Sequence, residues 1–213
     1  MSLVQPLDES QPLPFAPGSG PFRIKGDTYN GHLDYVTKHV PGGVQAMLAG
    51  FKDPRLVTFF QQRFLAASRY DIIPLVSAGH VCARLTAKTF AEFVRMRSQY
   101  QASRDLNGLY RMLLKLSSPA SMLKRLPALL AQYLDFVGPT VETPVSASCS
   151  RLRGGPIPLM LVPWFRVVNE VYLQVTLIAA GAKAVTVRPL FDEPAGELHG
   201  CPAVFMNYEV EWQ

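Results

Sequence analysis

The chain has 213 residues, of which 48% are hydrophobic and 17% are charged. A chain of this length and hydrophobic content buries a sizeable core, which excludes a globally disordered protein. The formal net charge of +5 is compatible with weak attraction to anionic partners. Many ordinary soluble domains carry as much charge, so composition alone does not indicate a nucleic-acid-binding protein.

The cysteine pattern and the N-terminal sequence both favour a cytoplasmic location. Cys82, Cys149 and Cys201 are odd in number and widely spaced, which is not the pattern of a disulfide framework. The opening sequence "MSLVQPLDES" lacks the features of a signal peptide, and no segment reaches the ~18 consecutive apolar residues of a membrane span. We therefore expect a cytoplasmic protein without a transmembrane segment.

Residues 1–21 are rich in proline and glycine, which predicts an irregular arm. Two interpretations remain open: a disordered tail, or an arm that packs on its own domain or on a neighbour. Residues 22–213 are expected to form a single α+β domain.

Helical spacing dominates the first two-thirds of this domain. A short strand is expected at 22–26, and apolar residues then recur every three or four positions in runs that predict helices at 27–40, 55–69 and 87–101. The run from 71 to 86 is ambiguous, because Pro74 and Gly79 interrupt it.

The stretch "LNGLYRMLLKLSSPASMLKRLPALLAQYLDF" predicts a helical hairpin at 106–136. Ser118 is a good helix cap, and Pro119 is a good first helical residue. The second helix has a wide apolar face from Met122 to Phe136, and Pro127 is expected to kink it.

Beyond residue 138 the pattern changes to alternation, which is typical of strands. We expect a strand that begins at Val141 and buries a face containing Val141, Val145, Ala147 and Cys149. A loop is expected at 153–163, and strands at 182–189 and 203–212. The run at 164–181 fits both a strand and a helix, and its length and the stop at Gly181 favour a helix. In the last strand the side chains of Val204, Met206, Tyr208, Val210 and Trp212 share one face.

The fold class predicted from this order is α+β. The helical N-terminal two-thirds is expected to pack on a small, mostly antiparallel C-terminal sheet with the order β-α-β-β.

Several motifs resemble those of a paralogous protein family of myxobacteria. They are an "IKG" start, a "YR-x-LL-x-L-x-SP" helix break, an aromatic-Asp helix end and a Glu-Val-Trp strand. In this chain they correspond to Ile24 to Gly26; Tyr110, Arg111, Leu113, Leu114, Leu116, Ser118 and Pro119; Tyr133 and Asp135; and Glu209 to Trp212. That family is distantly similar to the ligand-binding fold of haem-based nitric-oxide sensors, 4-vinyl-reductase-type domains and TRAPP vesicle-tethering subunits. The resemblance covers about residues 22–213 and implies the same α+β fold.

The chain departs from the resemblance in two places. It has Ile72-Ile73-Pro74 where family members often carry Trp-Tyr-Pro. Haem sensors also need a proximal histidine and a Tyr-x-Ser-x-Arg triad, and "YQASR" at 100–104 has a different spacing. On these grounds haem is not supported, and no cofactor is predicted.

Candidates for catalysis are His80 with Cys82, a nucleophile beside a base, and Tyr110. The sequence has no glycine-rich phosphate loop and no pair of carboxylates in an apolar context. Asp105 and Asp135 are expected to be surface or cap residues. These observations lean away from an enzyme without excluding one.

A metal site would need three or four protein ligands, and the candidates are His199, Cys201 and Cys149. An ordinary loop with a buried thiol is the simpler interpretation, so no metal is predicted.

Basic residues gather on the predicted helices: Arg95, Arg97, Arg104, Arg111, Lys115, Lys124 and Arg125. The simplest interpretation is a solvated helix face. The alternative is a surface that docks an acidic protein through Arg104, Arg111 and Lys115. Aromatic residues do not interleave with these charges as stacking platforms would, which disfavours nucleic acid.

The wide apolar helix faces are first of all core. In the fold that the resemblance implies, a cavity can open between the helices and the sheet, and a helix kinked at Pro127 and rich in Leu and Met suits its wall. Its expected wall consists of Leu113, Met122, Leu126, Leu130, Tyr133 and Trp164. The favoured function is a non-enzymatic sensor that binds a small apolar ligand, or a dimerising scaffold. The alternatives are an enzyme acting on a small hydrophobic substrate and a recruitment subunit that uses the basic helices.

Overall fold

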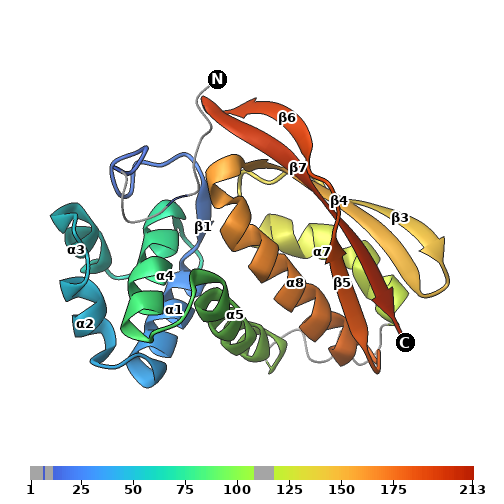
Figure 1. The fold of residues 1–213 in the computed structure, drawn as a ribbon, viewed down its shortest axis with the longest axis horizontal. Helices are drawn as coiled ribbons and strands as arrows, with labels where there is room; N and C mark the ends of the chain where they lie inside the picture. The colour runs from blue at the N-terminus through green and yellow to red at the C-terminus, as the bar shows by residue number, and fades with distance from the viewer. Residues whose placement is uncertain (1–6, 8–11, 108–117) are drawn as a thin grey trace.

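The computed structural model describes residues 7, 12–107 and 118–213. It confirms the predicted α+β class, with a helical N-terminal part beside a C-terminal antiparallel sheet (Figure 1). The elements in chain order are β1 (Arg23–Lys25), α1 (Gly26–His39), α2 (Gly43–Ala49), α3 (Pro54–Phe60), β2 (Arg69–Asp71), α4 (Ile73–Leu85), α5 (Phe90–Asn107), α7 (Pro119–Tyr133), β3 (Val141–Ser146), β4 (Cys149–Pro158), the 3-10 turn η1 (Leu159–Leu161), α8 (Val162–Ala179), β5 (Val185–Pro189), β6 (Glu193–Leu198) and β7 (Cys201–Trp212).

Local sequence signals account for several helix boundaries. Ser118 caps α7 as predicted, since its hydroxyl accepts from the amide of Ser121 at 3.2 Å, and Pro119 follows at the first helical position. The run at 71–86, ambiguous in sequence, forms α4. Its Pro74 lies in the first turn, where a missing N–H costs no helical hydrogen bond.

The helix predicted over 55–69 is wrong beyond Phe60, where α3 ends. The following aromatic residue is buried in a loop instead, because the ring of Phe64 stacks on that of Tyr29 with 4.3 Å between centroids. The loop is held by tertiary bonds, including one from the side-chain amide of Asn30 to the Phe64 carbonyl at 3.2 Å. Helical spacing of aromatics therefore marked a core cluster here.

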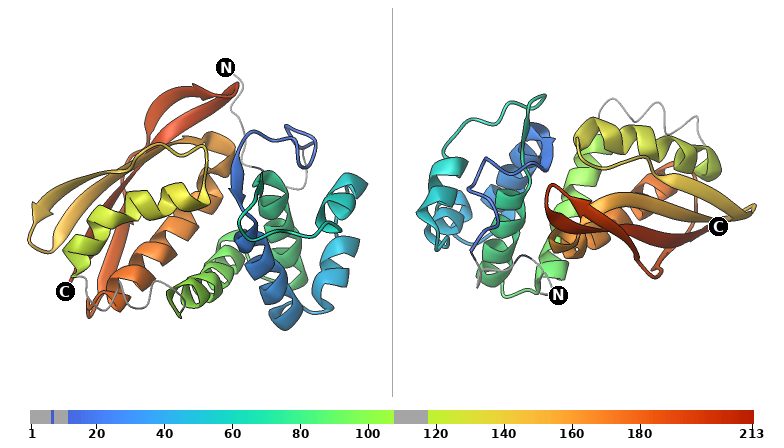
Figure 2. Two further views of the ribbon diagram at one scale, coloured as in Figure 1. Left: turned by 180° about the vertical axis from the view of Figure 1, so that it is seen from behind. Right: turned by 90° about the horizontal axis from the view of Figure 1, so that it is seen from above.

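The main sheet has the strand order β3-β4-β7-β5, β6 also pairs with β7, and every pair is antiparallel. Helices α7 and α8 lie against one face of it (Figure 2). On β7 the side chains of Met206, Tyr208, Val210 and Trp212 are buried as predicted. The loop expected at 153–163 begins later, because β4 continues through Pro158 with a register shift between Gly154 and Ile157. Strand β6 was not predicted.

The buried face predicted for the first strand of the sheet is wrong. Val141 and Val145 of β3 are each 53% exposed. Pairing with β4 explains this, because Val141 lies opposite Arg153 while Glu142 lies opposite the buried Leu152. The valines thus share the outer face of the sheet with arginines, and register decides the face.

The described part of the arm packs on the domain, which corresponds to the second interpretation of this segment. The buried carboxylate of Asp71 accepts hydrogen bonds from the amides of Gly18, Gly20 and Ile73 at 3.0–3.1 Å. Burial raises the pKa of Asp71, while the three amide donors oppose that rise. One side chain thus joins the arm to the start of α4.

None of the helices in residues 12–107 and 118–213 combines the length and apolar character needed to cross a membrane. The hydrophobic core instead runs through both layers, from Phe22 and Tyr29 to Leu177 and Met206, with all four side chains at most 1% exposed.

His32 lies in this core with an exposed fraction of 1%, and its Nε2 atom has no hydrogen-bond partner. Burial, followed by the charge of Arg97, lowers the pKa of His32 from 6.5 to about 3. The folded protein therefore keeps this imidazole neutral, while the unfolded chain takes up a proton below pH 6.5.

We expect this histidine to make the protein acid-sensitive. Between about pH 7.5 and about pH 5 the wild type should lose roughly 2 kcal/mol more unfolding free energy than His32→Leu, because only the histidine charges on unfolding. Urea unfolding monitored by circular dichroism at both pH values measures the difference. His39→Leu, which removes an exposed histidine from the same helix, is the control. Equal pH dependence of His32→Leu and the wild type would contradict the buried neutral state.

Candidate functional site

A cavity of about 110 Å³ lies where the helical part meets α7 and α8. Its wall is mostly apolar and combines Ile24 and Thr28 from the N-terminal part with residues of α5, α7 and α8. Five of the six side chains expected in the pocket wall line it: Met122, Leu126, Leu130, Tyr133 and Trp164. The sixth, Leu113, lies outside the described residues.

A second cavity of about 60 Å³ lies between α7, α8 and the sheet, next to Leu152 and Met206. It shares Leu126, Leu130 and Phe165 with the first cavity. These side chains therefore stand between two spaces, and α7 is packed less tightly on α8 than a filled core would be.

The larger cavity has a polar side formed by α5. Arg97 and Asp105 both line it, eight residues or about 12 Å apart along the helix axis. The Asp105 carboxylate accepts from the Gln101 amide at 2.8 Å and from the Tyr172 hydroxyl at 3.0 Å. The Arg97 guanidinium donates through Nη2 to the carbonyl of Thr28 at 2.6 Å. These bonds connect α1, α5 and α8 around one end of the cavity.

Burial dominates the electrostatics of this group. It lowers the pKa of Arg97, against the opposing influence of Tyr172 and Asp105. It raises the pKa of Asp105, against the hydrogen bonds from Gln101 and Tyr172. The pKa of Tyr172 is raised well above its usual value, first by burial and then by the Asp105 charge, so its hydroxyl acts as a donor.

Two of these residues lie elsewhere than their sequence pattern predicted. Arg97 was grouped with the outer basic face but is 4% exposed, and Asp105 was expected at the surface but lines the cavity. The signal was present, because Arg97, Gln101 and Asp105 recur every four residues beside the buried Phe93 and Val94. Charged residues on that stripe are a sign of a buried polar site.

The candidate catalytic residues do not converge. His80 and Cys82 are two residues apart on α4, a spacing at which side chains point to different sides of a helix. Burial raises the pKa of Cys82 to about 12, so the residue is a protonated thiol at neutral pH. The His80 ring instead stacks on Phe90 with 3.8 Å between centroids. Tyr110 lies outside the described residues.

The candidate metal ligands are also far apart. His199 lies in the turn before β7 and Cys201 is its first residue, whereas Cys149 pairs with Glu211 near its end. Ten residues of strand separate Cys201 from Glu211, which is about 33 Å.

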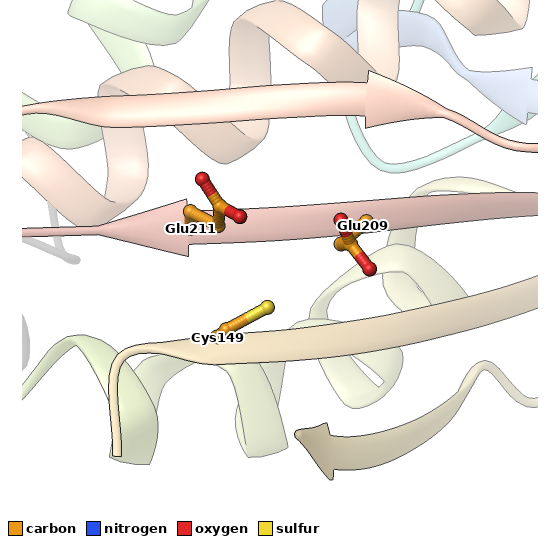
Figure 3. A group of neighbouring side chains, drawn as sticks. All are labelled: Cys149, Glu209 and Glu211. Atoms are coloured by element: carbon orange, nitrogen blue, oxygen red, sulfur yellow. The ribbon is translucent and has the colours of Figure 1, made fainter. Parts of the chain in front are cut away.

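Cys149 is instead close to Glu209 and Glu211, with one ligand atom of each within 4.8 Å of the others (Figure 3). Arginines already pair with these carboxylates: Arg151 with Glu209 at 3.2 Å and Arg188 with Glu211 at 2.5 Å. The two carboxylates are therefore members of cross-strand ion pairs on the outer face of the sheet.

The predicted docking residues are represented by Arg104 alone, because Arg111 and Lys115 lie outside the described residues. Arg104 is 3.9 Å from the Asp34 carboxylate, which also binds Lys38 and Tyr100. Docking of an acidic partner therefore stays a prediction.

Comparison with known proteins finds similarity at the level of the fold. No protein-family model and no curated protein sequence matches the chain. Solved structures of H-NOX domains do match. They include Cs H-NOX carrying 4-cyano-L-phenylalanine, at TM-score 0.64 and 11% identity over 89% of this chain and 97% of that one. The Fe(II) unliganded H-NOX protein of K. algicida matches at TM-score 0.61 and 10% identity, with the same coverage of both chains.

A third match is a structure titled for the function of haem distortion in the H-NOX family, at TM-score 0.64 and 9% identity over 89% of this chain and 95% of that one. The chain therefore has the fold of H-NOX domains, as the resemblance to the haem-NO-binding fold implied. The narrower resemblance to a myxobacterial family stays a prediction.

These matches correct the prediction that haem is not supported. That prediction rested on missing sequence motifs, yet structures with haem in their titles share the whole fold at 9% identity. At such distance the three-dimensional arrangement persists while local motifs change, so a missing motif does not exclude the cofactor.

The bond between Asp105 and Tyr172 should carry measurable stability. In a double-mutant cycle of Asp105→Ala and Tyr172→Phe we expect a coupling of about 1–2 kcal/mol in unfolding free energy, because the hydroxyl and the carboxylate are bonded away from bulk water. Tyr70→Phe, combined with Asp105→Ala, is the control and should be additive within about 0.5 kcal/mol. Additivity of the first pair would contradict the described bond.

Proposed function

We propose that this chain is a ligand-binding sensor domain whose ligand is a small apolar molecule held in the cavity between α1, α5, α7 and α8. The cavity itself carries the proposal, because a largely apolar space with a few convergent polar groups is the usual form of a small-molecule site. The fold shared with H-NOX domains supports the same function.

The position of the cavity supports a signalling role. Its wall takes residues from the helical layer and from α7 and α8, so a ligand contacts both layers at once. A ligand that binds one relative arrangement of these layers more tightly shifts the population toward that arrangement. The second, smaller cavity gives Leu126 and Leu130 of α7 room to change position.

The size of the space sets the ligand class. A dry cavity of about 150 Å³ holds benzene or xenon, and the larger cavity here is about 110 Å³. The ligand is thus expected to be a small ring or short chain unless α7 moves and the two spaces merge.

Haem is the second candidate ligand, favoured by the titles of the structural neighbours. Haem iron is held in proteins by His, Cys, Met or Tyr, and among the described wall residues Met122, Tyr133 and Tyr172 belong to these types. When bound, the group would supply an iron centre for a diatomic gas. In the present form the space is below the roughly 300–1,000 Å³ of drug-sized sites, so haem requires a wider separation of α7 from α5 and α8.

Native mass spectrometry of the chain purified from its own organism distinguishes the two ligands. The mass of haem and a Soret absorption band would identify haem. The mass of a small organic molecule without that band would identify the apolar ligand.

For the small-ligand proposal we expect benzene to bind the purified chain, observed as shifts of methyl signals of Leu126, Leu130 and Val168 in NMR spectra. Leu130→Trp should remove these shifts, because the larger side chain fills the cavity. Leu65→Trp is the matched control, since the Leu65 side chain is 53% exposed and is not among the residues that line the cavity. A wild type whose methyl signals do not respond to saturating benzene would contradict the proposal.

A further inference from the structure

Arg97 is a buried cation with an unused donor in the cavity wall. Its side chain lines the cavity, and 4% of the residue is exposed. The Nε atom has no hydrogen-bond partner. A buried charged group with an unmade hydrogen bond is energetically costly, so an acceptor that reaches the Nε–H group is stabilised there.

The surrounding groups do not supply the missing acceptor. Thr28 accepts from Nη2 through its backbone carbonyl. The charges of Asp105 on α5 and Asp27 on α1 act on Arg97. Asp105 accepts hydrogen bonds from Gln101 and Tyr172, and Asp27 accepts from the Gln101 amide at 3.5 Å. Within residues 12–107 and 118–213, no carboxylate forms an ion pair with Arg97 at 4.0 Å or less, whereas Arg95 on the same helix has Glu170 at 2.8 Å.

We propose that Arg97 binds the carboxylate of a small apolar acid whose body occupies the cavity. This inference rests on the proposed function and adds the chemical class of the ligand. A guanidinium donates in a planar fork that matches a carboxylate, and such charge-assisted bonds are roughly twice as strong as neutral ones. The apolar remainder of the wall, including Leu126, Leu130 and Trp164, selects a ring or short chain as the body.

A carboxylate bound at Arg97 and the Asp105 carboxylate would carry the same charge, and their separation along α5 limits the repulsion between them. Asp105 lies two helical turns from Arg97, and its oxygens are held by Gln101 and Tyr172. An acid bound at Arg97 therefore lies beside the cation, while the Asp105 oxygens are already hydrogen-bonded to Gln101 and Tyr172.

The test compares benzoate with benzyl alcohol, two probes of similar size that differ in the charged head. Isothermal titration calorimetry on the full chain should show benzoate binding about 10- to 100-fold more tightly than benzyl alcohol, as one charge-assisted bond predicts. Arg97→Met should remove this preference while benzyl alcohol still binds. Arg97→Lys keeps the charge without the fork and should give an intermediate preference.

Arg95→Gln is the control, because it removes a cation from the same helix that is paired with Glu170 and lies outside the wall. Its affinity for benzoate should equal that of the wild type. A second readout does not depend on variants: benzoate should shift the NMR signal of the Arg97 Nε–H group, and benzyl alcohol should shift it much less.

The outcomes separate this inference from the proposed function. Equal affinity for the two probes, or an unchanged Arg97 Nε–H signal with benzoate, would overturn the carboxylate assignment and leave the apolar cavity in place. Binding of neither probe, together with no response to benzene, would overturn both.

Discussion

The structure depends on how α5 accommodates charged side chains between the N-terminal helical layer and the layer formed by α7, α8 and the sheet. Arg97 and Asp105 line a mostly apolar cavity of about 110 Å³. In such a space an unpaired charge is strongly unfavourable. Their partners come from α1 and α8, so meeting this electrostatic requirement connects the helical layer with the sheet layer. The cavity lies at this junction, and its polar side is the same set of groups.

The tight packing elsewhere makes the junction distinctive. The aromatic cluster around Tyr29 is filled by large side chains. Around α7 two spaces remain, separated by leucines that have room on both sides. In the proposed sensor, α7 is the element whose leucines have room to move, and such movement would couple ligand occupancy to the shape of the domain. A sensor needs such an element, whereas a plain scaffold does not.

Much of the fold could be predicted because the spacing of apolar residues within each segment indicates its secondary structure. Helix α7 and strand β7 follow from apolar spacing, and α8 follows from the length of its run and the stop at Gly181. The five pocket-wall residues follow from the kink expected at Pro127 and from the resemblance. The missed features depend on partners distant in sequence. Pairing with β4 decides which face of β3 is buried, so alternation in β3 alone predicted the wrong valines. The position of Arg97 was predicted wrongly because it lies near the edge of an apolar stripe. At such an edge the helical spacing is compatible with either an exposed or a buried side chain, and only the neighbouring helices decide between them.

The central claim is that an open apolar cavity lies between α1, α5, α7 and α8, and xenon binding in a crystal tests it most directly. Xenon enters dry apolar cavities of this size and scatters strongly. If the cavity is open, a crystal under xenon pressure should show a strong anomalous peak between Met122, Leu130 and Trp164. A well-ordered crystal structure in which side chains fill that space, with no xenon peak there, would contradict it.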